Sequence, residues 1–249
     1  LDDPDAAIKS FKKALSITPS YVEAHFNLGN VFRKQKQLDA AIKSYDQVLS
    51  INPNHTEAHY NLGIIYNKLG QSDSAVKHYT RTLEIKPDYA EAHYNLGIIF
   101  NDLRQLDTAV KHYTRALEIK PDYAEAHYNL GIIFKDLGQL DTAVKHYRRA
   151  LEVKPDYVEV LSNLGVTLHE LDQPKAAINC YERALAINPN NAEAYSNLGV
   201  TLKELGQFDA AINNFEKALV IKADFVEAYF NLGNTLRVLG QLNAAVKNY

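Results

Sequence analysis

Nine histidines and a single cysteine are the side chains of this sequence that could ligate a metal ion or support nucleophilic catalysis. Seven of the histidines recur every 34 residues in two sets, which are His25, His59, His93 and His127, and His78, His112 and His146. Equivalent side chains of adjacent helical units lie at least about 8–10 Å apart, whereas zinc holds its ligands at about 2.1 Å. Neighbours such as His93 and His127 therefore cannot share an ion. We expect the first set to pack in the core or between helices, the second to lie on the solvated surface, and neither to bind a metal.

Cys180 has no histidine at a spacing that would activate its thiol, so it is not expected to act as a nucleophile. One cysteine also excludes an intrachain disulfide and a thiolate metal cage. The sequence contains no glycine-rich phosphate loop, nucleophile elbow or metal-binding helix motif. We therefore predict that this chain holds no catalytic residues and binds no cofactor.

A row of asparagines is a stronger candidate for a binding function. Asparagine is a poor residue for a helix interior, so its recurrence at one position of a helical repeat suggests a function. Its amide offers one acceptor and two donors, which match the C=O and N–H groups of an extended peptide. We predict a peptide-binding ladder, with a structural role or simple repeat duplication as the alternatives. The row consists of Asn27, Asn61, Asn95, Asn129, Asn163, Asn197 and Asn231.

The residues beside this row suggest an apolar and aromatic groove in the first half of the chain. An aromatic residue precedes each of the first four asparagines, and an isoleucine follows three of them at a distance of three residues. Seven asparagine contacts at ~0.5–1.5 kcal/mol each give at most ~4–10 kcal/mol before association costs, so we expect affinity around micromolar. The groove residues are Phe26, Tyr60, Tyr94, Tyr128, Ile64, Ile98 and Ile132, whereas Ser162 and Ser196 replace the aromatic residue later in the chain.

The elements that position these side chains follow from an internal repeat. Asn-Leu-Gly occurs seven times at a constant interval of 34 residues. A fixed period of this size is typical of stacked supersecondary units. We number each unit so that Asn-Leu-Gly falls at positions 6 to 8, and expect a single array over residues 1–249. It comprises the partial unit 1–21, the units 22–55, 56–89, 90–123, 124–157, 158–191 and 192–225, and the partial unit 226–249.

Each unit predicts two helices, a first (A) and a second (B). Gly70, Gly138, Gly206 and Gly240 fall where an A helix should end and a left-handed residue is required. A B helix follows, for example over residues 140–153, and Pro155 stops it. A capping box at the start of each A helix also explains the acidic row at position 2. Its pairs are Ser20/Glu23, Asn54/Glu57, Asp88/Glu91, Asp122/Glu125, Asp156/Glu159, Asn190/Glu193 and Asp224/Glu227.

Side-chain size predicts how the two helices meet. The small residues at positions 8 and 20, such as Gly131 and Ala143, allow close approach, and the aromatic residue at position 24, such as Tyr147, fills the space beside them. Ordering 34 residues costs roughly 50 kcal/mol, which about 2,000 Å² of apolar burial would offset. One hairpin cannot bury so much, so the units must stack on one another.

These positions resemble the tetratricopeptide repeat pattern over the whole chain. The resemblance implies an all-α, right-handed superhelical solenoid of stacked antiparallel helix pairs whose A helices line a concave surface, with a protein or peptide as partner. Departures such as Val48, Thr82, Leu168, Leu202, Leu236 and Ala223 remove no helix. The unit 90–123 matches with His93, Leu96, Gly97, Phe100, Ala109, Tyr113, Ala116 and Pro121.

Charge and hydropathy exclude other partners. With 27 Lys+Arg against 30 Asp+Glu, the net charge of −3 argues against nucleic acid and against an anionic membrane surface. No apolar run approaches the ~18 residues of a spanning helix, and the start lacks a signal-peptide pattern, which favours the cytoplasm and leaves the periplasm open. The absence of Met indicates a slice of a longer chain or a processed form. Neither end has a polar capping helix, so we expect the ends to associate with one another at high concentration.

The leading hypothesis is thus a protein-interaction scaffold. The asparagine row and the Ser-Asn-Leu-Gly segments at 162–165 and 196–199 also resemble the repeat region of O-linked N-acetylglucosamine transferase. This resemblance implies the substrate-binding arm of a larger enzyme as an alternative. Repeats that clamp a peptide carboxylate need Lys or Arg at positions 2, 5 or 6, which this chain lacks. RNA-reading helical repeats typically have a longer period and a basic surface.

Overall fold

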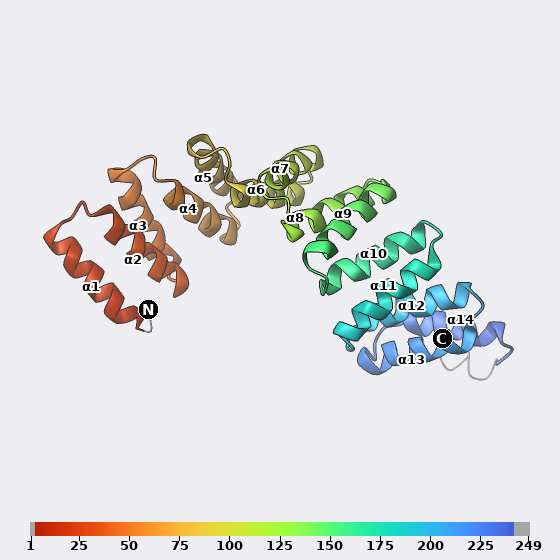
Figure 1. Ribbon diagram of the computed structural model, residues 1–249. Helices are drawn as coiled ribbons and strands as arrows, with labels where there is room; N and C mark the ends of the chain where they lie inside the picture. Colours follow the sequence, from red (N-terminus) through yellow and green to blue (C-terminus); the bar gives the residue numbers. More distant parts are fainter. Residues whose placement is uncertain (1–2, 242–249) are drawn as a thin grey trace. The chain divides into compact units, whose positions relative to one another are not determined.

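The computed structural model describes residues 3–241, which form fourteen α-helices joined by short loops (Figure 1). Contacts divide the chain into two compact halves, an N-terminal half (Leu1–Pro121) and a C-terminal half (Asp122–Tyr249). The first contains α1 (Pro4–Ile17), α2 (Val22–Lys34), α3 (Leu38–Ile51), α4 (Thr56–Lys68), α5 (Ser72–Ile85), α6 (Ala90–Asp102) and α7 (Leu106–Ile119). The second contains α8 (Ala124–Asp136), α9 (Leu140–Val153), α10 (Val158–Glu170), α11 (Pro174–Ile187), α12 (Ala192–Glu204), α13 (Phe208–Ile221) and α14 (Val226–Val238).

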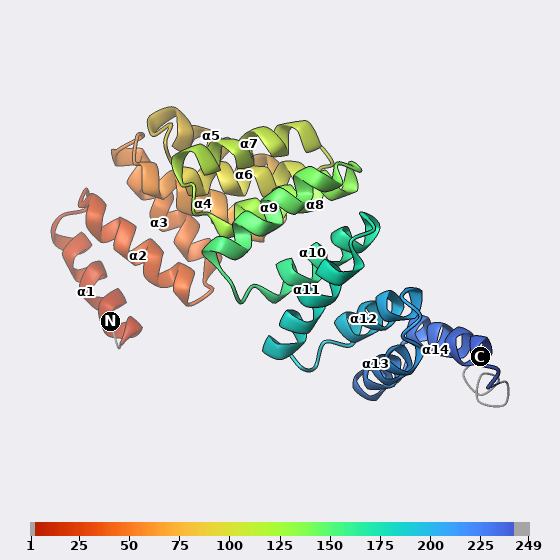
Figure 2. The ribbon, with the colours of Figure 1, turned by 45° about the vertical axis from the view of Figure 1, so that its right-hand side comes forward.

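Even-numbered helices are the A helices of the repeat, and odd-numbered helices are the B helices. Each A helix from α2 to α12 pairs with the following B helix as an antiparallel hairpin, and each hairpin packs on the next within its half of the chain (Figure 2). The predicted all-α fold of stacked helix pairs is therefore confirmed. The predicted B helix over 140–153 is confirmed as α9, and the expected opening helix is α1, which Asp3 caps by accepting from the N–H groups of Asp5 and Ala6.

The core of each hairpin is the predicted contact between small and aromatic residues. Ala143 and Tyr147 of α9 are fully buried, and a Cβ added to Gly131 of α8 would overlap the Tyr147 ring. The tyrosine or phenylalanine at position 24 is among the largest fully buried side chains of six successive hairpins. Because the ring rests directly on the glycine backbone, the two helices approach more closely than larger residues would permit.

The A helices end as the glycines predict. Gly70, Gly138, Gly206 and Gly240 have φ angles of 71° to 74°, in the left-handed region. The same position 15 is left-handed without glycine in the other units, where Lys36 has a φ of 61°, Arg104 of 59° and Asp172 of 56°. The hairpin geometry therefore imposes this conformation whichever residue is present.

The predicted capping boxes are wrong by one residue. Each A helix begins after position 34, so that Tyr89 rather than Asp88 is the N-cap of α6 and Glu91 is the second helical residue. Of the seven A helices that the structure describes, only α4 and α12 have a side-chain cap, from His55 Nδ1 and Asn191 Oδ1. Tertiary packing accounts for the shift in three units, because the ring of His55, Tyr89 or Tyr157 packs against the preceding A helix and so holds the N-cap residue in place.

No helix among the described residues is both long enough and apolar enough to cross a membrane. The last eight residues, on which the incomplete terminal B helix was predicted, lie outside the described part of the chain. The proposed end-to-end association therefore stays a prediction.

Candidate functional site

The asparagine row lies where neighbouring A helices meet. Consecutive A helices contact one another directly in the C-terminal half of the chain, as α8 and α10, α10 and α12, and α12 and α14 do. Asn27 is exposed and Asn61 is buried, whereas the other five asparagines are half-buried. The row is therefore partly available to a ligand and partly involved in the packing of repeats.

Three of the amides bridge adjacent A helices as hydrogen-bond donors, and a fourth, Asn231 of α14, accepts from Lys203 Nζ of α12 at 3.3 Å. Asn95 Nδ2 of α6 donates to the Tyr60 hydroxyl of α4 at 3.2 Å, and Asn163 Nδ2 of α10 donates to the Tyr128 hydroxyl of α8 at 3.0 Å. Asn61 Nδ2 donates at 3.2 Å to Oδ1 of another asparagine, Asn30. Each of the three donating amides uses one of its two hydrogens here, and has a second hydrogen and an acceptor oxygen. The row thus has a structural role, and hydrogen-bonding capacity beyond it.

The aromatic flank of the row is also half-buried. Tyr60 has its ring centroid 5.8 Å from that of Tyr79 and 4.8 Å from that of Tyr89, the N-cap residue of the next A helix. Phe26 packs similarly, 5.8 Å from Tyr45. Burial raises the pKa of the Tyr60 hydroxyl, which therefore stays protonated and can donate as well as accept. The aromatic flank therefore leaves part of each ring, and the tyrosine hydroxyl beside the asparagine amide, available to a ligand.

The rest of this flank has the same half-buried character. Tyr94 packs with Tyr113 at 5.7 Å between centroids, and Tyr128 packs with Tyr157 at 5.3 Å. In the later units Phe230 is 57% exposed. Ile64, Ile98 and Ile132, the predicted apolar residues of the groove, are all half-buried.

Polar residues that the sequence analysis did not single out also join neighbouring A helices. Asn30 Oδ1 accepts from the Tyr45 hydroxyl at 2.7 Å in addition to Asn61. In the C-terminal half of the chain, Lys135 Nζ lies 3.2 Å from Glu170, and His169 Nε2 lies 2.6 Å from Glu204. The signal for these pairs was the basic residue at position 12 followed by an acidic residue at position 13 of the next unit.

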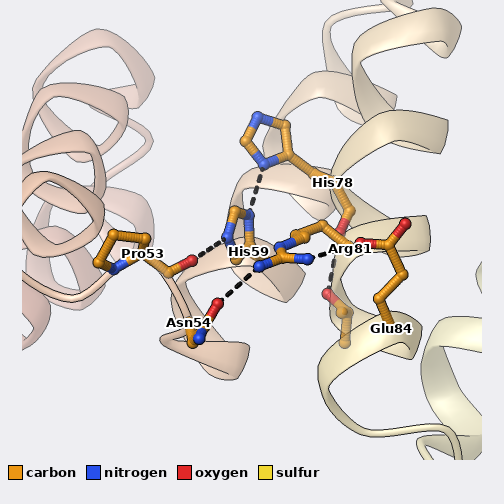
Figure 3. A network of polar contacts seen from close by, with 7 residues as sticks. Pro53, Asn54, His59, His78, Arg81 and Glu84 are labelled. Carbon is orange, nitrogen blue, oxygen red and sulfur yellow. Dashed lines mark hydrogen bonds and ion pairs between the residues drawn. The ribbon is translucent and has the colours of Figure 1, made fainter.

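The histidines form an arrangement that the sequence analysis missed. A position-4 histidine of an A helix faces a position-23 histidine of the B helix in the same hairpin, with 3.1 Å between their Nδ1 atoms. Figure 3 shows one such pair. The second set is therefore half-buried and paired, not solvated as predicted. The pairs are His59 with His78, His93 with His112, and His127 with His146.

Each pair continues into an aromatic stack. The ring of Tyr66 is stacked on His78 with centroids 5.3 Å apart, and Phe100 is stacked on His112 at 5.4 Å. Burial, together with smaller contributions from the neighbouring His59 and Lys77, lowers the pKa of His78 to about 4. The pKa values of His112 and His146 are likewise lowered to about 4, first by burial. His78, His112 and His146 are therefore neutral near pH 7.

A signal for this pairing was present in the sequence. Histidine occurs at position 23 in three of the four units that have histidine at position 4 and an aromatic residue at position 11, and the fourth, 22–55, has Ser44 there. Where position 4 is Leu161 or Tyr195, position 23 is Cys180 or Asn214. Cys180 is buried among apolar residues, and burial raises the pKa of its thiol, which agrees with the expectation that it is not a nucleophile.

Comparisons with known proteins identify the repeat. Tetratricopeptide repeat models match residues 56–122, 88–156 and 122–190, and related models match 3–35, 29–70, 180–213, 201–237 and 226–249. No curated protein sequence matches the chain.

Solved structures with the same fold include the following three. A structure of YrrB, described as a TPR protein with an unusual peptide-binding site, has a TM-score of 0.64 at 23% identity, covering 75% of this chain and 96% of YrrB. A MamA structure has a TM-score of 0.61 at 25% identity, covering 67% and 97%. PilF of Pseudomonas aeruginosa has a TM-score of 0.66 at 20% identity, covering 78% and 88%.

Proposed function

The chain belongs to the tetratricopeptide repeat family, and we propose that it binds an extended peptide segment of a protein partner along its A helices. Proteins of this family mediate protein–protein interactions, and the repeat scaffold is typically not catalytic. The observation that carries the proposal is the asparagine at position 6 of all seven A helices, at the seam between neighbouring helices.

The chemistry of this seam suits a peptide main chain. At two junctions the asparagine amide lies beside a phenol, as Asn95 does beside Tyr60 and Asn163 beside Tyr128. Amide donors and acceptors bind the backbone of a ligand irrespective of its sequence. The half-buried rings and isoleucines of the N-terminal half then select apolar or aromatic side chains of the ligand.

The spacing of the repeats favours one ligand conformation. Neighbouring helices pack at about 8–10 Å between their axes. A peptide in the polyproline II conformation advances about 9.3 Å in each turn of three residues, so it presents the same face to successive repeats. A β-strand, with a side-chain period of two residues and about 6.6 Å, does not keep this register. We therefore expect every third ligand residue to face an asparagine.

The proposal is tested by selecting binders from a displayed library of unstructured peptides and titrating the best one by calorimetry. Substituting Asn27, Asn129 and Asn197 together with alanine is expected to weaken binding at least about tenfold, since each hydrogen bond contributes roughly 0.5–1.5 kcal/mol. Asn213, exposed on the B helix α13, supplies the control, because Asn213→Ala should leave affinity unchanged. Unaltered affinity in the triple variant, with helicity preserved, would exclude the asparagine row as the binding surface.

A second candidate is that these repeats present protein substrates to an enzyme, as the resemblance to the glycosyltransferase arm implies. The Ser-Asn-Leu-Gly segments of α10 and α12, in which Ser196 is buried and Ser162 half-buried, favour it. The test is an assay of the natural full-length protein for transfer of N-acetylglucosamine from its nucleotide sugar to peptides selected on the repeats. Absence of transfer with a bound peptide would reject this candidate and leave the scaffold function.

A further inference from the structure

The three histidine pairs have the geometry of a metal-ligand set. Their Nδ1 atoms lie 3.1 Å apart in each of three hairpins, α4/α5, α6/α7 and α8/α9. A cation about 2.0–2.1 Å from both nitrogens would see them at an angle of about 95–100°, between the octahedral and tetrahedral values. The same separation repeats because each pair occupies equivalent positions of the repeat.

Hydrogen bonding to the main chain orients one histidine in each of the first two pairs. His59 Nε2 lies 3.0 Å from the Pro53 carbonyl oxygen, and His93 Nε2 lies 3.3 Å from that of Pro87. A carbonyl can only accept, so Nε2 carries the proton and the Nδ1 lone pair faces the partner histidine. Histidines that bind metals are commonly oriented by such a bond from the other ring nitrogen.

We propose that each pair binds an imidazole-preferring divalent cation, such as Cu²⁺ or Zn²⁺, through its two Nδ1 atoms, with water as the remaining ligands. Without a cation, His78 Nδ1–H donates to His59 Nδ1. Binding replaces this hydrogen bond, and the His78 proton moves to Nε2, so neither ring changes its charge. Neutral imidazole is a preferred ligand of copper, nickel and zinc.

The surroundings of the first pair provide room for water and compensate charge. A cavity of about 500 Å³ is lined by both histidines together with Lys77, Arg81 and Glu84. The Arg81 guanidinium donates to Glu84 at 2.7 Å and to Asn54 Oδ1 at 2.6 Å, so its charge is largely neutralised (Figure 3). Within residues 3–241 no group of three His, Cys, Asp or Glu side chains comes together, so the proposed site has two protein ligands and modest affinity.

The experiment is a calorimetric titration of the chelator-treated chain with Zn²⁺, and separately with Cu²⁺, at pH 7.5. We expect three cations per chain, and the loss of one with each of His78→Asn, His112→Asn and His146→Asn. Asparagine is chosen because Asn214 already occupies this position in α13. His169→Asn, which removes a histidine outside the pairs, should change nothing. Titrated histidine ¹⁵N resonances should shift at Nδ1 of the paired residues.

A gain-of-site variant makes the test sharper. His25 already lies 2.8 Å from the Pro19 carbonyl oxygen, like the paired histidines, but position 23 of its hairpin is the buried Ser44. Ser44→His should therefore create a fourth pair beside Phe32 and raise the stoichiometry from three to four. If this variant fails to fold, as judged by circular dichroism, the three single variants decide the question.

Two results would overturn the proposal. One is the absence of binding at millimolar cation, which would make the pairs hydrogen bonds only. The other is binding that the three asparagine variants leave at the same stoichiometry and affinity, which would assign the cations to other histidines. Neither result bears on peptide binding by the asparagine row, because none of the paired histidines belongs to that row.

Discussion

Tyr79 lies directly on the backbone of Gly63, so that a Cβ on Gly63 would sit 2.5 Å from Cε1 of the tyrosine ring. The ring is 1% exposed, and the same contact recurs in other hairpins down to Phe215 on Gly199. Because the Tyr79 ring is buried, it cannot move aside without disturbing the core. This contact sets the distance between the two helices of a repeat.

Gly63→Ala is therefore expected to destabilise the chain. In an exposed helix interior, alanine is favoured over glycine by about 1 kcal/mol. Here the overlap with the Tyr79 ring should reverse the sign and cost about 1–3 kcal/mol, the usual range for overpacking a core. Urea denaturation followed by circular dichroism measures the change. A double-mutant cycle with Tyr79→Leu should show strong coupling, and a stabilised Gly63→Ala variant would contradict the contact.

The left-handed residue at position 15 offers a matched pair of variants. Arg104 has a φ of 59° and Gly138 a φ of 72° in units that differ at few other positions. A left-handed conformation costs a residue with a Cβ about 1–2 kcal/mol, and part of that is offset because glycine loses more backbone entropy on folding. Arg104→Gly should stabilise by about 1 kcal/mol and Gly138→Arg should destabilise by a similar amount. Melting temperatures that move in the opposite directions would refute this explanation.

Two buried tyrosines should respond differently to loss of the hydroxyl. The Tyr45 hydroxyl donates to Asn30 Oδ1 at 2.7 Å, whereas that of Tyr147 is buried with no hydrogen-bond partner in the described part of the chain. Tyr45→Phe should cost about 1 kcal/mol, since it leaves an acceptor with one bond fewer. Tyr147→Phe should be neutral or stabilising, and Phe215 shows that the repeat accommodates phenylalanine here. Equal effects of the two substitutions on unfolding free energy would contradict these assignments.

The paired histidines predict acid destabilisation of the metal-free chain. The pKa values of His78, His112 and His146 in the folded chain are lowered to about 4 from an ordinary value near 6.5. A group whose folded pKa is depressed contributes stability that is complete above about pH 6.5 and is lost as the pH falls toward 4. Each histidine should lower the unfolding free energy by at most about 1.4 kcal/mol per pH unit within that window.

Urea denaturation in chelating buffer at several values between pH 7.5 and 4.5 measures this dependence. Replacing His78, His112 and His146 together with asparagine should flatten the profile in the same window. The profile of His169→Asn serves as the control, because that histidine lies outside the pairs. An unchanged slope in the triple variant would show that other groups cause the acid sensitivity.

Most of the fold could be predicted because it depends on local patterns that repeat. The helix over 140–153, the left-handed residue at Gly138 and the contact of Gly131 with Tyr147 all follow from residue type and spacing within one unit. The starts of the A helices could not be predicted in the same way. Asp88 is the better capping residue, but the Tyr89 ring packs on Tyr60 and makes its own residue the N-cap.

The amino-acid sequence alone determined the 34-residue unit, its two helices and the row of position-6 asparagines along the A helices, since helical periodicity places them without reference to other parts of the chain. Only the tertiary structure decided that Asn95 donates to Tyr60 and that His59 faces His78. These contacts join different helices, and the rotation and approach of those helices depend on how the rings pack against glycine. The spacing of residues along the sequence does not give the distance between two packed helices.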